Sequence, residues 1–165
     1  MPTKPFRHRL NHDLANGAYD DRGIRYMMIR PDALMGIFAR LGEPARSEAF
    51  AAIAHSVEER GAHSARSYIG HGTEDQLLEI IAATAPDLGW GVWQFAHADE
   101  AITLTVRNSP FAAAAGTLPP PVCYPILGML RGVSGILFGA PAAVTETACA
   151  AAGGDTCTFT AARTP

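Results

Sequence analysis

Three cysteines and one glutamate near the end of the chain have the residue types of a metal site. They are Cys123, Glu146, Cys149 and Cys157, and they include every cysteine of the 165-residue sequence. Thiolate sulfur binds zinc readily, and four protein ligands that leave no position for water are typical of a structural ion. The spacing alone also fits three ordinary thiols, or a Cys149–Cys157 disulfide with Cys123 left free. The residues therefore indicate a structural zinc site and leave these two alternatives open.

The elements that must position these residues can be predicted from hydropathy. Residues 122–138 are apolar almost all round, which favours a buried helix that begins near Cys123. Residues 142–149 and 156–162 are expected to form antiparallel strands on either side of a glycine-rich turn at 153–155. A metal ion bound by all four side chains would tie the start of the helix to both strands of this hairpin.

The spacing of Glu146 and Cys149 conflicts with a regular strand. Residues three apart on a strand point to opposite faces of the sheet, so these two side chains cannot both reach one ion. We therefore predict that the strand breaks or bulges near Thr147 and Ala148. The free N–H groups at the start of the preceding helix are expected to offset the negative charge of the ligands.

The rest of the chain predicts an α+β domain with an antiparallel sheet packed against several helices. Residues 23–29 fit a strand or a first core segment. Helical spacing and end signals predict helices over residues 31–41, 44–60 and 73–85, the second ending at Gly61 and the third before Pro86. Residues 90–97 and 100–107 are predicted to form a hairpin. We expect an N-terminal arm over residues 1–22, flexible in character, and a single domain over 23–165, with the motif-bearing part at 109–162.

From Ser109 onward the chain resembles the 4-vinyl reductase domain family. The family pattern is a cysteine that opens a glycine-containing apolar helix, a strand with E-x-x-C, a glycine-rich turn and C-x-F. This sequence has all of these in order, as Cys123, Gly128 and Gly132, Glu146 and Cys149, Gly153 and Gly154, then Cys157 and Phe159. The resemblance implies the ligand-binding fold that the family shares with vesicle-tethering subunits. It also implies that zinc is held by Cys123, Glu146, Cys149 and Cys157.

The resemblance further implies a ligand in an apolar cavity between the helices and the sheet. Family members include sensor domains of aromatic-responsive activators, proteins linked to bacteriochlorophyll synthesis, and hydrocarbon-binding proteins. Aromatic and aliphatic side chains that could line such a cavity are Trp93, Phe95, Ile102, Leu104, Tyr124, Leu127, Met129 and Val144, with Phe111 near the entrance. Candidate polar contacts are His63, His71 and His97. For any single one of these residues, an ordinary place in the core or on the surface is the more common case.

The expected function is therefore a zinc-containing sensor or carrier domain for a hydrophobic or aromatic ligand. The alternatives are an accessory or reductase-like protein of tetrapyrrole synthesis and a non-catalytic interaction scaffold. The sequence has no G-x-G-x-x-G after a strand, no P-loop and no serine nucleophile elbow, so binding is favoured over catalysis.

Charge and hydropathy limit the kinds of partner that the chain is expected to have. The formal net charge of −3 gives no electrostatic reason for nucleic-acid binding. The apolar segment at 122–138 is too short to cross a bilayer comfortably and contains Arg131, so no transmembrane helix is expected. No secretory signal is visible, and we expect a cytoplasmic location, where thiols stay reduced. The resemblance implies a homodimer, and any signal is expected to pass through a separate protein.

Overall fold

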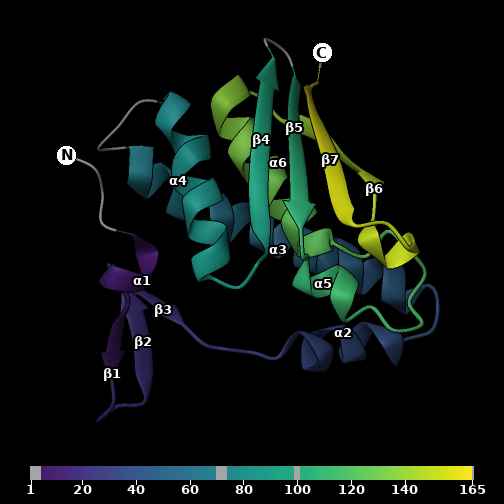
Figure 1. Ribbon diagram of the computed structural model, residues 1–165, viewed down its shortest axis with the longest axis horizontal. Coiled ribbons are helices and arrows are strands. Elements are labelled where there is room, and N and C mark those ends of the chain that lie inside the picture. Colours follow the sequence, from purple (N-terminus) through teal and green to yellow (C-terminus); the bar gives the residue numbers. More distant parts are fainter. Residues whose placement is uncertain (1–4, 70–73, 99–100, 165) are drawn as a thin grey trace.

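The computed structural model describes residues 5–69, 74–98 and 101–164, and its centre is a four-stranded antiparallel sheet (Figure 1). The strands lie in the order β4-β5-β7-β6. Their bounds are Val92–Ala98 for β4, Ala101–Arg107 for β5, Ala142–Ala148 for β6 and Thr156–Arg163 for β7. The predicted α+β class and both predicted hairpin pairings are confirmed. The residues that join β4 to β5, at 99–100, lie outside the described residues.

Two long helices lie on one side of this sheet. They are α3 (Ala45–Ile69) and α6 (Tyr124–Phe138), which lie behind the sheet in Figure 1. The helix α6 packs on the strands, and α3 packs against α6. The face of the sheet on this side carries fully buried side chains, among them Ile102, Leu104 and Phe159. Threonines such as Thr103 and Thr105 alternate with these residues along β5 and point to the other face. The strand period therefore separates a packed face from a polar one.

Shorter elements complete the main body. The helix α4 (Glu74–Asp87) runs beside the edge strand β4, as Figure 1 shows. The remaining helices are α2 (Pro31–Ala39), α5 (Pro110–Ala113) and the 3-10 turn η1 (Ala150–Ala152). The predicted start of a helix at Pro31 is confirmed. Thr73, where the third predicted helix was expected to begin, lies outside the described residues.

Two predicted helix ends are wrong. The helix α3 continues past Gly61 to Ile69, because Gly61 faces α6: a Cβ there would lie 2.8 Å from the sulfur of Met129. The glycine thus permits close packing and does not end the helix. Pro86 lies inside the last turn of α4, although a proline there was expected to follow the helix.

The N-terminal residues form a small three-stranded sheet of their own. It consists of β1 (Asn11–Asp13), β2 (Ala18–Asp21) and β3 (Ile24–Tyr26), preceded by α1 (Phe6–Arg9). The buried ion pair Arg9–Asp21, at 2.9 Å, holds α1 to this sheet, and Arg7 pairs with Asp87 of α4. Residues 5–21 are therefore structured within the stretch predicted as an arm. The division of the chain into an arm and a domain stays a prediction.

The segment between β3 and α2 differs from the prediction of a core segment at 23–29. Met27 and Met28 are 76% and 80% exposed, and Ile29 is also exposed. Only residues 24–26 of this stretch form a strand.

None of the described helices combines the length and the apolar character that a membrane span requires.

Candidate functional site

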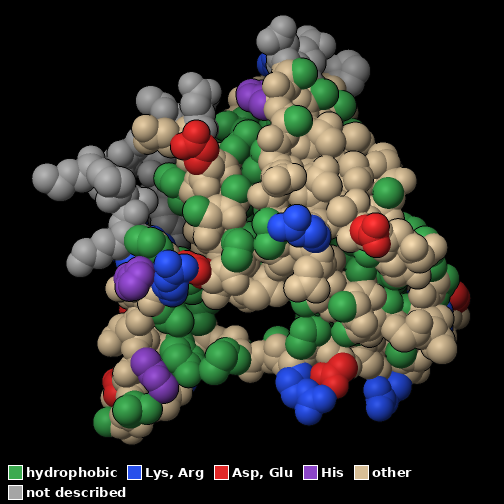
Figure 2. Space-filling model, in the orientation of Figure 1, with side chains coloured by type: hydrophobic (Ala, Val, Ile, Leu, Met, Phe, Trp, Pro, Cys, Tyr) green, Lys and Arg blue, Asp and Glu red, His purple; other side chains and the backbone are tan. Residues whose placement is uncertain are grey.

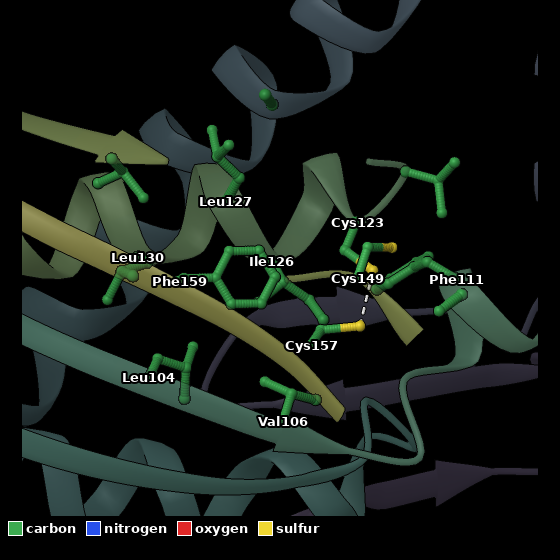
Figure 3. Packing of buried hydrophobic residues seen from close by; sticks show 14 of the residues in the cluster. Leu104, Val106, Phe111, Cys123, Ile126, Leu127, Leu130, Cys149, Cys157 and Phe159 are labelled. Carbon is green, nitrogen blue, oxygen red and sulfur yellow. Dashed lines mark hydrogen bonds between the residues drawn. The ribbon is translucent and has the colours of Figure 1, made fainter. Parts of the chain in front are cut away.

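The four predicted metal ligands come together at one corner of the main sheet. One ligand atom from each of Cys123, Glu146, Cys149 and Cys157 lies within 4.8 Å of the other three. Figure 3 shows the three cysteines gathered beside Phe111, where the start of α6 meets the end of the sheet. Cys123 and Cys157 are fully buried and Cys149 is nearly so. These residues are close enough together to hold a metal ion.

A bulge in β6 makes this convergence possible. Glu146 pairs with Phe159 and Ala148 with Thr158, so Thr147 is an extra residue without a partner in the register. The hydroxyl of Thr147 donates to the carbonyl oxygen of Thr158 at 3.2 Å. Because one additional residue reverses the alternation of side chains, Glu146 and Cys149 face the same side. The predicted break at Thr147 and Ala148 is confirmed.

Backbone N–H groups surround the cluster, as the charge of the predicted ligands requires. The N–H of Cys123, the residue before α6, donates to Glu146 Oε2 at 3.1 Å. The N–H of Ala150, in η1, donates to Cys157 Sγ at 3.3 Å. These donors offset the negative charge of a carboxylate and a thiolate that would be costly to bury alone. The turn that positions η1 uses Gly153, whose φ of 97° suits glycine.

The three thiols differ in acidity. The hydrogen bond with Cys157, followed by burial, raises the pKa of Cys123, while the same hydrogen bond lowers the pKa of Cys157 to about 7. Burial, with the neighbouring Glu146, raises the pKa of Cys149 to about 11. Without a cation, Cys157 is therefore the most acidic thiol and Cys123 the donor toward it. A divalent ion favours the thiolate form of all three through its own charge.

The geometry fits a tetrahedral metal ion better than a disulfide. All three cysteines are free, and the sulfurs of Cys123 and Cys157 lie 3.5 Å apart, well beyond a disulfide bond of about 2.05 Å. Sulfurs bound about 2.3 Å from one zinc ion lie roughly 3.8 Å from each other. Glu146 Oε1 is buried and has no hydrogen-bond partner among the described residues. A cation at the centre of the cluster would satisfy this oxygen.

Sequence reasoning missed Ser109 as a neighbour of the cluster. Its hydroxyl lies 3.3 Å from Cys123 Sγ and also accepts from the N–H of Ala112 at 3.4 Å, which caps α5. Serine before proline is a helix-start signal, and the Ser109-Pro110 pair could have predicted this short helix. The contact with Cys123 depends on tertiary packing and has no local signal.

A second feature is a groove of about 590 Å³ at the opposite edge of the sheet, where α4 runs beside β4. The helix contributes Leu78, Glu79 and Ala82. The strands contribute Trp93, Gln94, Phe95, Ala96 and His97 of β4, and Thr103 and Thr105 of β5. Figure 2 shows hydrophobic side chains gathered between α4 and β4 in this region. The groove is therefore apolar along part of its wall and polar toward the threonine face.

The structure separates the predicted ligand contacts into two groups. Trp93, Phe95 and His97 line the groove, although Trp93 is only 5% exposed and also belongs to the core cluster, against which Phe95 packs. Residues that lie in the packed core or against it are Ile102, Leu104, Phe111, Tyr124, Leu127, Met129 and Val144. His63 is exposed on α3, and His71 lies outside the described residues. A role of the second group in ligand binding stays a prediction.

The glycines of α6 allow α3 to pack closely against this helix. A Cβ at Gly128 would overlap the carbonyl oxygen of Ala54, and one at Gly132 would lie 2.7 Å from that of Glu58. Both carbonyls belong to α3. The space beside these glycines is thus filled by the backbone of α3.

The C-terminal part of the chain matches a known family model. Residues 102–163 match the family model of the 4-vinyl reductase domain, which confirms the resemblance over these residues. They include all four residues of the cysteine and glutamate cluster. No significant match was found among curated protein sequences.

Solved structures share the fold at low sequence identity. The chain is similar to the phenol-responsive sensory domain of the transcription activator PoxR, solved with phenol: the TM-score is 0.81 at 17% identity, over 94% of this chain and 85% of that one. A vinyl-4-reductase family protein from Methanocaldococcus jannaschii gives 0.55 at 15% identity, over 87% and 100%. A trafficking protein particle complex subunit 3 from Naegleria fowleri, covalently bound to palmitic acid, gives 0.55 at 13% identity, over 82% and 95%. The predicted ligand-binding fold is confirmed.

Proposed function

We propose that this chain is a small-molecule-binding domain, a sensor or carrier, for a hydrophobic or aromatic ligand. The observation that carries the proposal is the groove of about 590 Å³ that brings Trp93 and Phe95 together with hydrogen-bonding side chains. Pockets for small molecules have about 300–1,000 Å³ and combine apolar walls with a few polar groups. The likeness in fold to a phenol-responsive sensory domain supports the same function.

Zinc is the metal we propose for the cysteine and glutamate cluster. Three thiolates and one carboxylate suit zinc, and four protein ligands leave no open position for a reacting water. The ion is therefore structural: it ties the start of α6 to β6, to β7 and to the turn between them. The cysteines form no disulfide, and metal-bound thiols suit the reducing compartment expected from the sequence.

Filling the groove tests the ligand site. Ala96 lines the groove on the edge strand β4, and Ala143 occupies an exposed position on the other edge strand, β6. In Ala96→Phe the added ring occupies the space of the ligand, so binding of 2-naphthylmethanol, followed by fluorescence titration, weakens at least about tenfold. Ala143→Phe is the matched control and binds as the wild type does. Wild-type affinity in Ala96→Phe would show that the ligand binds elsewhere.

We also propose that the protein forms a homodimer. The exposed apolar side chains of Met27, Met28 and Ile29 support an interface in the N-terminal half, because clustered exposed apolar groups are usual at such contacts. Sedimentation equilibrium is expected to give twice the chain mass for the wild type and the monomer mass for Met28→Glu. A monomeric wild type would contradict this part of the proposal. A separate output protein would then have to read the ligand state of a single chain.

A further inference from the structure

The groove beside α4 carries one formal charge, and it is negative. Among the described residues that line it, Glu79 is the only acidic one, and none is a lysine or arginine. Among the residues that the structure describes, Glu79 has no ion-pair partner. A carboxylate at the rim of an apolar groove is therefore available to a charged group of a ligand.

Two aromatic residues, Trp93 and Phe95, line the same groove as this carboxylate. The rings of Trp93 and Phe95 meet edge to face, with centroids 6.1 Å apart. The indole N–H of Trp93 already donates to the carbonyl oxygen of Trp90 at 2.9 Å, so it is no free donor. Trp93 is buried and Phe95 only partly so, and Phe95 is therefore the more accessible ring. Aromatic faces attract cations and repel the electron-rich groups of anions.

The other polar side chains of the groove carry no fixed charge, and they include the imidazole of His97. Gln94, Thr103 and Thr105 offer hydrogen bonds to uncharged or positively charged ligand groups. No lysine or arginine among the described lining residues provides the fixed positive charge that a carboxylate or phosphate of a ligand requires. The groove thus discriminates by charge as well as by shape.

Resting on the proposed function, we propose that the groove selects aromatic amines, with the ammonium group of the ligand beside Glu79 and its ring against Phe95. Neutral aromatic compounds of the same shape bind more weakly, and aromatic carboxylates more weakly still. Glu79 acts as the residue that sets this preference, because its carboxylate attracts the amine and repels the carboxylate.

A matched set of three probes tests the preference: 2-naphthylmethylamine, 2-naphthylmethanol and 2-naphthoate, each titrated against the full chain. At low salt the amine is expected to bind about three- to fivefold more tightly than the alcohol, the range for an exposed ion pair, and the carboxylate less tightly than either. In Glu79→Gln the amine and the alcohol bind equally, while the affinity for the alcohol is unchanged. Glu48→Gln, an exposed glutamate of α3 away from the groove, keeps the preference of the wild type.

The outcomes separate this inference from the proposed function. If the alcohol binds and Ala96→Phe abolishes its binding, but the amine shows no advantage or keeps it in Glu79→Gln, the charge preference is overturned and the binding function stands. If none of the three probes binds a chain that unfolds cooperatively, both are overturned. The inference is supported if the amine binds more tightly than the alcohol in the wild type and in Glu48→Gln, and loses this advantage in Glu79→Gln.

Discussion

The cysteine and glutamate cluster and the groove lie at opposite edges of the same sheet, and they are built in opposite ways. The cluster is buried, its ligand atoms lie within 4.8 Å of one another, and the backbone around it bulges and turns to bring them there. The groove is open and forms where α4 lies beside the edge strand β4. The first arrangement suits a permanent component of the fold, and the second suits a ligand that must enter and leave.

The largest expected effect comes from removing the metal. Exhaustive chelation should lower the melting temperature of the whole domain, because metal binding contributes directly to folding free energy. Cys157→Ser should lower the free energy of unfolding by about 3–5 kcal/mol, as measured by urea denaturation. The chelator should have no further effect on this variant. An unchanged melting temperature of the wild type after chelation would mean that the cluster does not hold the fold together.

The contact between α3 and α6 is the next test, since it decides whether the interior is packed or open to a ligand. Gly128→Ala should destabilise the protein by about 1–3 kcal/mol, because its methyl group meets the backbone of α3. Gly135→Ala is the matched control in the same helix: its methyl group would lie 3.7 Å from the nearest carbonyl oxygen. Higher helix propensity should stabilise that variant by about 0.5–1 kcal/mol. If Gly128→Ala left the stability unchanged but prevented binding of 2-naphthylmethanol, the ligand would bind at this helix contact and not in the groove.

Glu146 tests the weakest ligand of the cluster. Glu146→Gln keeps the shape of the side chain but removes its charge, so the affinity for zinc, measured by competition with a chelator, should fall by at least about tenfold. Binding of 2-naphthylmethanol at the other edge of the sheet should not change once the protein is saturated with zinc. Equal zinc affinity in the variant would exclude Glu146 as a ligand.

Substitution of Ser134 is expected to change the stability least. Like Glu146, Ser134 has a buried oxygen without a hydrogen-bond partner among the described residues, but it lies outside the cluster. Ser134→Ala therefore removes a desolvated hydroxyl group and should stabilise the protein by about 1 kcal/mol in urea denaturation. Destabilisation by the same amount would indicate a partner for this hydroxyl.

The sequence contains more information about the cluster than about the groove. The cluster could be predicted because its residue types are rare and its spacing demanded a bulge at Thr147, which the structure has. The main strands and the helix after Cys123 were also predictable, since each has clear periodicity or end signals. The length of α3 could not be predicted, because Gly61 has the form of a helix-end signal in the sequence but contacts Met129 in the structure.

The groove has no comparable signal. Trp93 and Phe95 were recognised as aromatic candidates, but their neighbours Glu79 and Thr103 come from different elements and have ordinary spacing. Which apolar residues fill the core and which border an open space depends on how closely α4 approaches β4. Periodicity predicts which face of a strand is buried and says nothing about gaps at its edge.

Native mass spectrometry of the purified chain, calibrated by elemental analysis, tests the central claim most directly. One zinc ion is expected for each chain, retained at the cluster and lost in Cys157→Ser. A wild-type mass equal to that of the bare polypeptide, with no stoichiometric metal in the sample, would contradict it.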